Sequence, residues 1–67
     1  MNKTTKIKFI MKNPEAMEVM DKHVPGFKTD KRLKMAANMT IEAVLAFLKY
    51  TEEQKSACYA DIEKFPE

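Results

Sequence analysis

Cys58 and His23 are the only residues of this 67-residue chain that could form a nucleophile–base pair. A thiolate activated by an imidazole would support covalent catalysis, which also needs a group that orients the base. Asp21 and Lys22 adjoin His23, but adjacent helical residues do not face one another. We therefore expect His23 to be a helix-end residue and Cys58 a small buried hydrophobe, and we expect no enzymatic activity.

The spacing of the potential ligand residues does not match a metal or cofactor site either. A single cysteine forms no internal disulfide, and no Cys/His pattern suits zinc. Helix capping and solvated surface positions account for the acidic residues of the second half, Glu52, Glu53, Asp61 and Glu63. A chain this short leaves little room for a pocket that excludes water, so we expect no cofactor, metal or small-molecule substrate.

Basic residues gather in the first half of the chain. Residues 1–34 hold nine Lys/Arg against four Asp/Glu, and residues 35–67 hold three against six, within a net charge of +2. Such asymmetry could steer an acidic partner or nucleic acid, favour head-to-tail self-association, or be plain surface charge. The basic set is Lys3, Lys6, Lys8, Lys12, Lys28, Lys31, Arg32 and Lys34.

Nucleic-acid binding is therefore an alternative function. Two features weigh against it. Specific base reading favours Arg, Asn and Gln over Lys, and the chain has one Arg. Helices over 30–38 and 41–49 would resemble a helix-turn-helix, but the second is too apolar to lie in a DNA groove.

Methionine is abundant, with six residues in the chain. Met fills imperfect cores and is also common on adaptable binding surfaces. On the second interpretation the chain is a non-enzymatic protein–protein interaction or accessory module that docks a partner protein or a second copy of itself. The predicted partner-binding residues are Phe27, Met35, Met39 and Tyr59, with Lys31 and Arg32 as steering charges.

Composition supports one folded domain over residues 1–67, frayed at 1–4 and 66–67. Hydrophobic residues make up 45% and charged residues 33% of the chain, which is not the composition of a disordered tail. No apolar run is long enough to span a membrane, and the start does not read as a signal peptide. With a free cysteine, this favours the cytoplasm.

A helix with marked ends lies at 14–23. Asn13 is a good N-cap, and Pro14 suits the first helical position. Met17, Met20 and Val24 form one apolar stripe, and Pro25 with Gly26 ends the helix.

The other segments also favour helices. Residues 5–12 fit a short helix capped by Thr5, or a strand paired with another molecule. Helices follow over 30–38, over 41–49 with Thr40 as cap, and from a Thr51–Gln54 capping box to Pro66. The fold class is all-α, a compact bundle of four to five short helices. Its expected core is Ile10, Met17, Met20, Val24, Phe27, Leu33, Ala37, Ile41, Val44, Leu45, Leu48, Cys58, Ile62 and Phe65.

An ordered series of short motifs also resembles a known family. The motifs are Asn13-Pro14-Glu15-Ala16, Val19-Met20-Asp21-Lys22-His23-Val24-Pro25-Gly26-Phe27, Lys34-Met35-Ala36 and Met39-Thr40-Ile41. They are similar to a small helical module of unassigned function in bacterial, often clostridial, proteins, where it is joined to glycoside hydrolases or carbohydrate esterases. The resemblance covers about residues 5–65 and implies a helical bundle with an accessory role in a carbohydrate-active enzyme. It carries over no catalytic residue.

Overall fold

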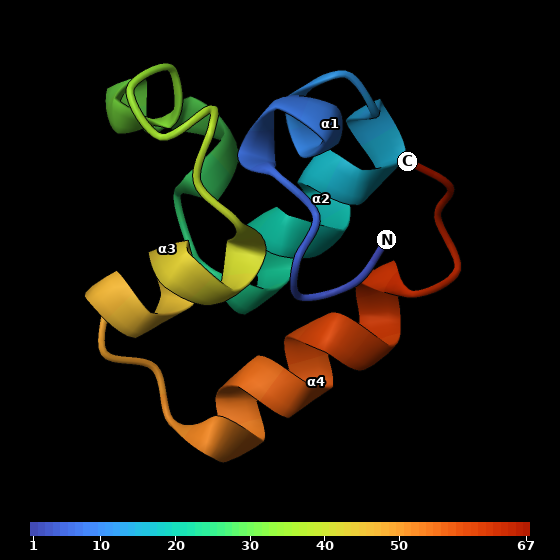
Figure 1. The fold of residues 1–67 in the computed structure, drawn as a ribbon, viewed down its shortest axis with the longest axis vertical. Coiled ribbons are helices and arrows are strands. Elements are labelled where there is room, and N and C mark those ends of the chain that lie inside the picture. The colour runs from blue at the N-terminus through green and yellow to red at the C-terminus, as the bar shows by residue number, and fades with distance from the viewer.

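The computed structural model describes all residues, Met1–Glu67, and is all-α, as predicted (Figure 1). Its α-helices are α1 (Ile7–Met11), α2 (Pro14–His23), α3 (Ile41–Phe47) and α4 (Glu52–Ile62). Two short 3-10 helices, η1 (Phe27–Thr29) and η2 (Lys31–Leu33), lie between α2 and α3. Helix α2 packs against α1, η1 and α4. No helix is both long enough and apolar enough to cross a membrane.

Side-chain caps fix the starts of three helices as the sequence predicted. The Oδ1 of Asn13 accepts hydrogen bonds from the backbone N–H groups of Glu15 and Ala16 at the start of α2. Thr40 caps α3. Thr51 and Gln54 form the predicted capping box at α4. These caps pair N–H groups that have no partner inside the helix.

Helix α1 begins differently from the prediction. Thr5 is not its cap: it is buried, and its hydroxyl accepts a hydrogen bond from the backbone N–H of Asn2. Instead, the first N–H groups of α1, on Ile7 and Lys8, donate to the carbonyls of Met39 and Ala37. The start of α1 is thus tied to the loop that precedes α3.

The start of α3 is in turn bonded to the segment that precedes α1. The N–H groups of Ile41 and Glu42 donate to the carbonyls of Thr5 and Lys3, each at a distance of 3.0 Å. The only β-like pairing is an isolated antiparallel bridge between Lys6 and Thr40. The strand alternative for residues 5–12 survives only as this bridge, which lies within one chain.

The prediction of a helix over 30–38 is wrong. Only Lys31–Leu33 is regular, as the 3-10 helix η2, and turns follow over 34–38. The N–H groups of Leu33 and Met35 donate to the carbonyls three residues earlier, Asp30 and Arg32, which is the 3-10 pattern and not the α-helical one. Leu33 is buried while Met35 is 88% exposed, so the apolar residues here do not share one helical face.

Helix α3 is shorter and less buried than expected. It ends at Phe47, and Lys49 then takes a left-handed conformation with φ of 63°. Ile41, Val44 and Leu45 are buried, but Phe47 is 72% exposed. The chain turns away before the far side of the helix is covered.

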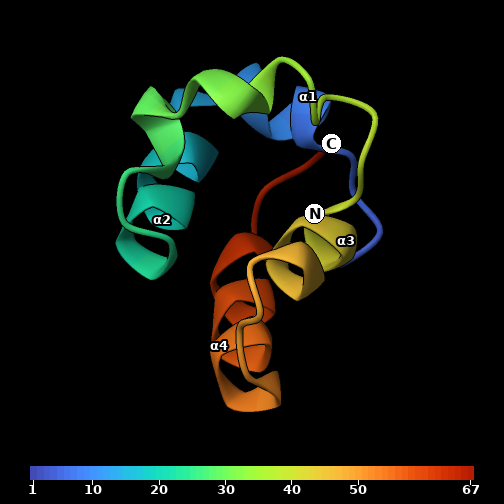
Figure 2. The ribbon, with the colours of Figure 1, turned by 90° about the vertical axis from the view of Figure 1, so that its left-hand side faces the viewer.

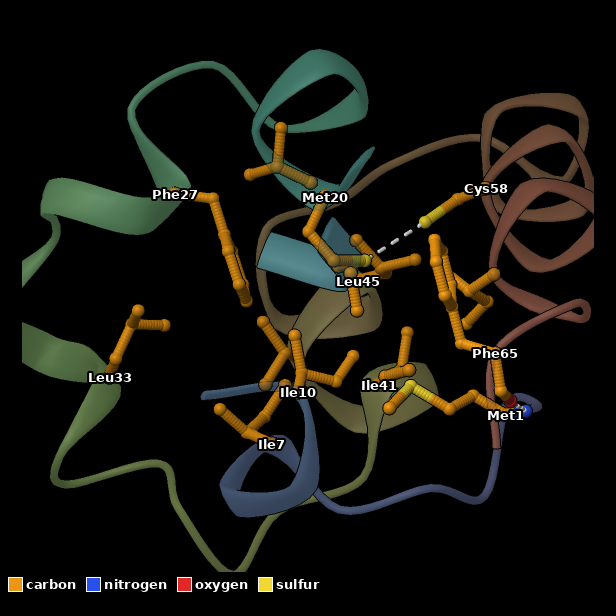
Figure 3. Close-up of a cluster of buried hydrophobic side chains, with 14 residues drawn as sticks. Met1, Ile7, Ile10, Met20, Phe27, Leu33, Ile41, Leu45, Cys58 and Phe65 are labelled. Carbon is orange, nitrogen blue, oxygen red and sulfur yellow. Dashed lines mark hydrogen bonds between the residues drawn. The ribbon is translucent and has the colours of Figure 1, made fainter. Parts of the chain in front are cut away.

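The core largely matches the prediction (Figure 3). Met17, Ala37 and Leu48 are half-buried, whereas Ile7 and Ala16 are additional core members. Met1 is buried as well, and its amino group donates to the carbonyl of Phe65. The structure thus places Met1 beside Phe65 in the core, while residues 2–4, 66 and 67 are exposed.

Candidate functional site

An apolar groove lies between α3 and the stretch that runs from the end of α2 to residue 39. Figure 2 faces the side of the molecule that carries both. The groove has a volume of about 360 Å³. It is lined by Val24, Phe27, Asp30, Arg32, Leu33, Met35, Ala36, Met39, Val44, Phe47 and Leu48.

Exposed apolar side chains concentrate at this groove. The large hydrophobic residues that remain exposed are Met35 at 88%, Phe47 at 72%, Met39 at 38% and Met11 at 37%. The first three line the groove, and only Met11, on α1, does not. Scattered exposed hydrophobes are ordinary, but a contiguous group around a hollow is typical of an interaction site.

The groove floor is continuous with the hydrophobic core. Val24, Phe27, Leu33 and Val44 line it and are at most 9% exposed. Close packing holds these side chains in place, so the hollow is part of the folded structure. These residues contact the core on one side. An apolar side chain of a ligand would contact their other side, which faces the groove.

One wall of the groove is held by an ion pair. The guanidinium of Arg32 contacts both carboxylate oxygens of Asp30, with Nη2 2.8 Å from Oδ2 and Nε 3.1 Å from Oδ1. Asp30 also accepts the backbone N–H of Arg32. These bonds hold the pKa of Asp30 down at about 2 and raise that of Arg32. Both groups are charged at neutral pH and satisfy each other.

The structure brings together four of the six predicted partner-binding residues: Phe27, Arg32, Met35 and Met39. Lys31 is exposed and precedes Arg32 in the chain, but it does not line the groove. Tyr59 lies on α4, outside the groove, and its hydroxyl is buried without a hydrogen-bond partner.

Phe47 and Leu48 line the groove but were not predicted as site residues. Both lie in a segment that is apolar on nearly every face, and such a segment is typical of a buried helix. The available signal was the excess of apolar residues in this segment. A domain of this size cannot bury apolar side chains on every face of α3, so one face remains exposed.

The candidate nucleophile pair is not assembled. The Nε2 of His23 lies 2.6 Å from the Oδ2 of Asp61. The Sγ of Cys58 lies 3.4 Å from the Sδ of Met20, inside the core (Figure 3). Burial raises the pKa of the Cys58 thiol to about 11, which leaves it protonated and poorly nucleophilic at neutral pH. The structure contains no group of three or more His, Cys, Asp or Glu residues placed to share a metal ion.

No protein-family model, curated protein or solved structure matches this chain. The resemblance to a helical accessory module stays a prediction, as does its carbohydrate connection.

Proposed function

We propose that this protein is a non-enzymatic docking module whose apolar groove binds side chains of a partner protein. The observation that supports the proposal is the gathering of Met35, Met39 and Phe47 around one preformed hollow. A partner residue inserted there would contact both the buried floor and these exposed rims.

The residue types suit adaptable recognition. Met35 and Met39 have flexible, polarizable side chains that can fit differently shaped apolar groups. Phe47 adds a rigid aromatic surface of the kind that often carries binding energy at interfaces. The groove volume, about 360 Å³, lies at the small end of ligand-pocket sizes. We therefore expect a short segment with a few anchor side chains to occupy it.

The test compares two methionines that are equally exposed but differently placed. Met39 is 38% exposed and lines the groove, whereas Met11 is 37% exposed and lies on α1. Immobilised wild type, Met39→Ser with Phe47→Ser, and Met11→Ser would each capture proteins from cells that make this chain. Circular dichroism would confirm that all three remain folded.

We expect wild type and Met11→Ser to retain the same proteins, and the groove variant to lose them. Equal capture by the groove variant would contradict the proposal. Light scattering on the same samples would show whether the retained partner is a second copy of the chain.

A further inference from the structure

Three lysines beside the groove have no acidic partner. Lys31 and Lys34 are exposed and adjoin the groove residues Arg32, Leu33 and Met35 in the chain, and Lys49, also exposed, follows the groove residue Leu48. None of the three takes part in any salt bridge of the structure.

The acidic residues of the same region are already paired. Asp30 binds Arg32, and Glu42 lies 3.6 Å from the ammonium of Lys3. Between residues 28 and 49 the chain holds no other Asp or Glu. The segments on both sides of the groove therefore carry exposed lysines that form no salt bridge.

From this we infer that the groove binds an amphipathic segment of another protein, in which apolar anchors are flanked by Asp or Glu. The inference rests on the proposed docking function and adds the charge of the partner. The apolar anchors fill the groove, and the flanking carboxylates reach Lys31 and Lys34 on one side and Lys49 on the other. Charges at an interface rim mainly steer association and reject wrong partners.

A second copy of the chain fits this site less well. If two copies met through their grooves about a two-fold axis, the lysines beside each groove would face those of the other copy. Like charges placed opposite one another oppose association.

The acidic face of α4 from a second copy would also lack anchors. Its exposed residues include Glu52, Glu53 and Asp61, but its exposed apolar side chains are only Ala57 and Ala60. Neither alanine is large enough to fill a groove of this size.

The experiment starts with a phage-displayed library of random peptides of about 16 residues, long enough to form a helix when bound. The library is selected on the wild-type protein after depletion on Met39→Ser with Phe47→Ser. We expect the enriched peptides to carry apolar residues at helical spacing together with Asp or Glu. Enrichment of neutral or basic peptides would overturn the inference and leave the docking function standing.

The affinity of one enriched peptide is then measured by fluorescence anisotropy. Lys31→Glu with Lys34→Glu should weaken binding about tenfold at low salt, and the difference should shrink at high salt. The matched control is Lys22→Glu with Lys64→Glu, which reverses two exposed lysines outside the groove and should leave affinity unchanged. Equal weakening by both pairs would mean that overall charge alone is responsible, which overturns the inference.

Failure of the docking function itself gives a different result. If no peptide is enriched and light scattering shows only monomer, both proposals fail. If no peptide is enriched but a dimer forms and is abolished by Phe47→Ser, the groove binds a second copy, and the acidic partner is excluded.

Discussion

The Nε2 of His23 lies 2.6 Å from the Oδ2 of Asp61 and joins the last turn of α2 to the last turn of α4. It is the only pairing of a basic with an acidic side chain between these two helices. The hydrogen bond from His23 lowers the pKa of Asp61. His23, the only base of the candidate nucleophile pair, therefore links α2 to α4 on the outside of their contact.

Asp61→Asn should lower the free energy of unfolding at weakly acidic to neutral pH. A carboxyl group with a lowered pKa stabilises the fold above its ordinary pKa, and that contribution is lost as the pH falls through the lowered value. The difference between wild type and variant should therefore disappear in strong acid. Urea unfolding over a pH series measures it, with Glu63→Gln as control, because Glu63 is an exposed acid of the same region that forms no salt bridge. A difference that persists in strong acid would show that the Asp61 carboxylate is not its source.

Cys58 should resist thiol reagents in the folded protein. Its Sγ is buried against Met20, and its pKa is raised to about 11, so little thiolate is present or accessible. At a pH of about 8, labelling should be at least a hundredfold slower than in urea, because it requires opening of the fold. Rapid labelling without denaturant would mean that α4 detaches easily from α2.

The same thiol predicts a loss of stability in alkali. A raised pKa means that the fold favours the protonated form, so its contribution is complete below the ordinary cysteine pKa of about 8.5. It is lost as the pH rises toward about 11. The free energy of unfolding of wild type should fall more steeply over this range than that of Cys58→Ala, which has no thiol to ionise. Parallel curves for the two proteins would contradict the assignment.

Sequence predicted the fold best where local chemistry decides it. Asn13, Thr40 and the Thr51–Gln54 pair each cap a helix through side chains a few residues away, so their patterns are visible in sequence. The segment over 30–38 could not be predicted in this way. The carbonyl of Ala37, near its end, accepts a hydrogen bond from Lys8 at the start of α1, and a contact so distant in the sequence leaves no local pattern.

The candidate site likewise combines residues that the local sequence indicates with a residue that only the tertiary fold brings to it. Phe27, Arg32, Met35 and Met39 lie on one stretch of chain, and their surplus of apolar and basic types marked them out. Phe47 joins them only because α3 folds back against that stretch. Periodicity assigned Phe47 to a buried helix, since one sequence does not show which face of a helix stays uncovered.

Two methionines offer a direct test of core against surface. Met20 is fully buried and Met35 is 88% exposed. Met20→Ala should lower the free energy of unfolding by about 2–5 kcal/mol, because it removes core contacts and leaves a cavity. Met35→Ala should change it by less than about 0.5 kcal/mol. Chemical denaturation of both variants measures this, and a large loss for Met35→Ala would place that side chain in the core and remove it from the docking surface.

Two left-handed residues should respond in opposite directions to substitution. Gly26 has φ of 84°, and a Cβ built on it would meet no atom within 4 Å, so Gly26→Ala adds backbone strain without a steric clash. We expect Gly26→Ala to lower the free energy of unfolding by about 1 kcal/mol. Lys49 has φ of 63° and bears a side chain, so Lys49→Gly should relieve backbone strain and raise the free energy of unfolding by about 0.5–1 kcal/mol.

In a domain of this size, Gly26→Ala should lower Tm by about 4–8 °C and Lys49→Gly should raise it by about 2–8 °C. Calorimetry would measure both. A lower Tm for Lys49→Gly would mean that the Lys49 side chain makes stabilising contacts that outweigh its strained backbone. Lys49 is also one of the three unpaired lysines beside the groove, so Lys49→Gly should bind the acidic peptide more weakly although its fold is more stable. A strained lysine kept where glycine would be more stable is the pattern expected when the side chain serves binding.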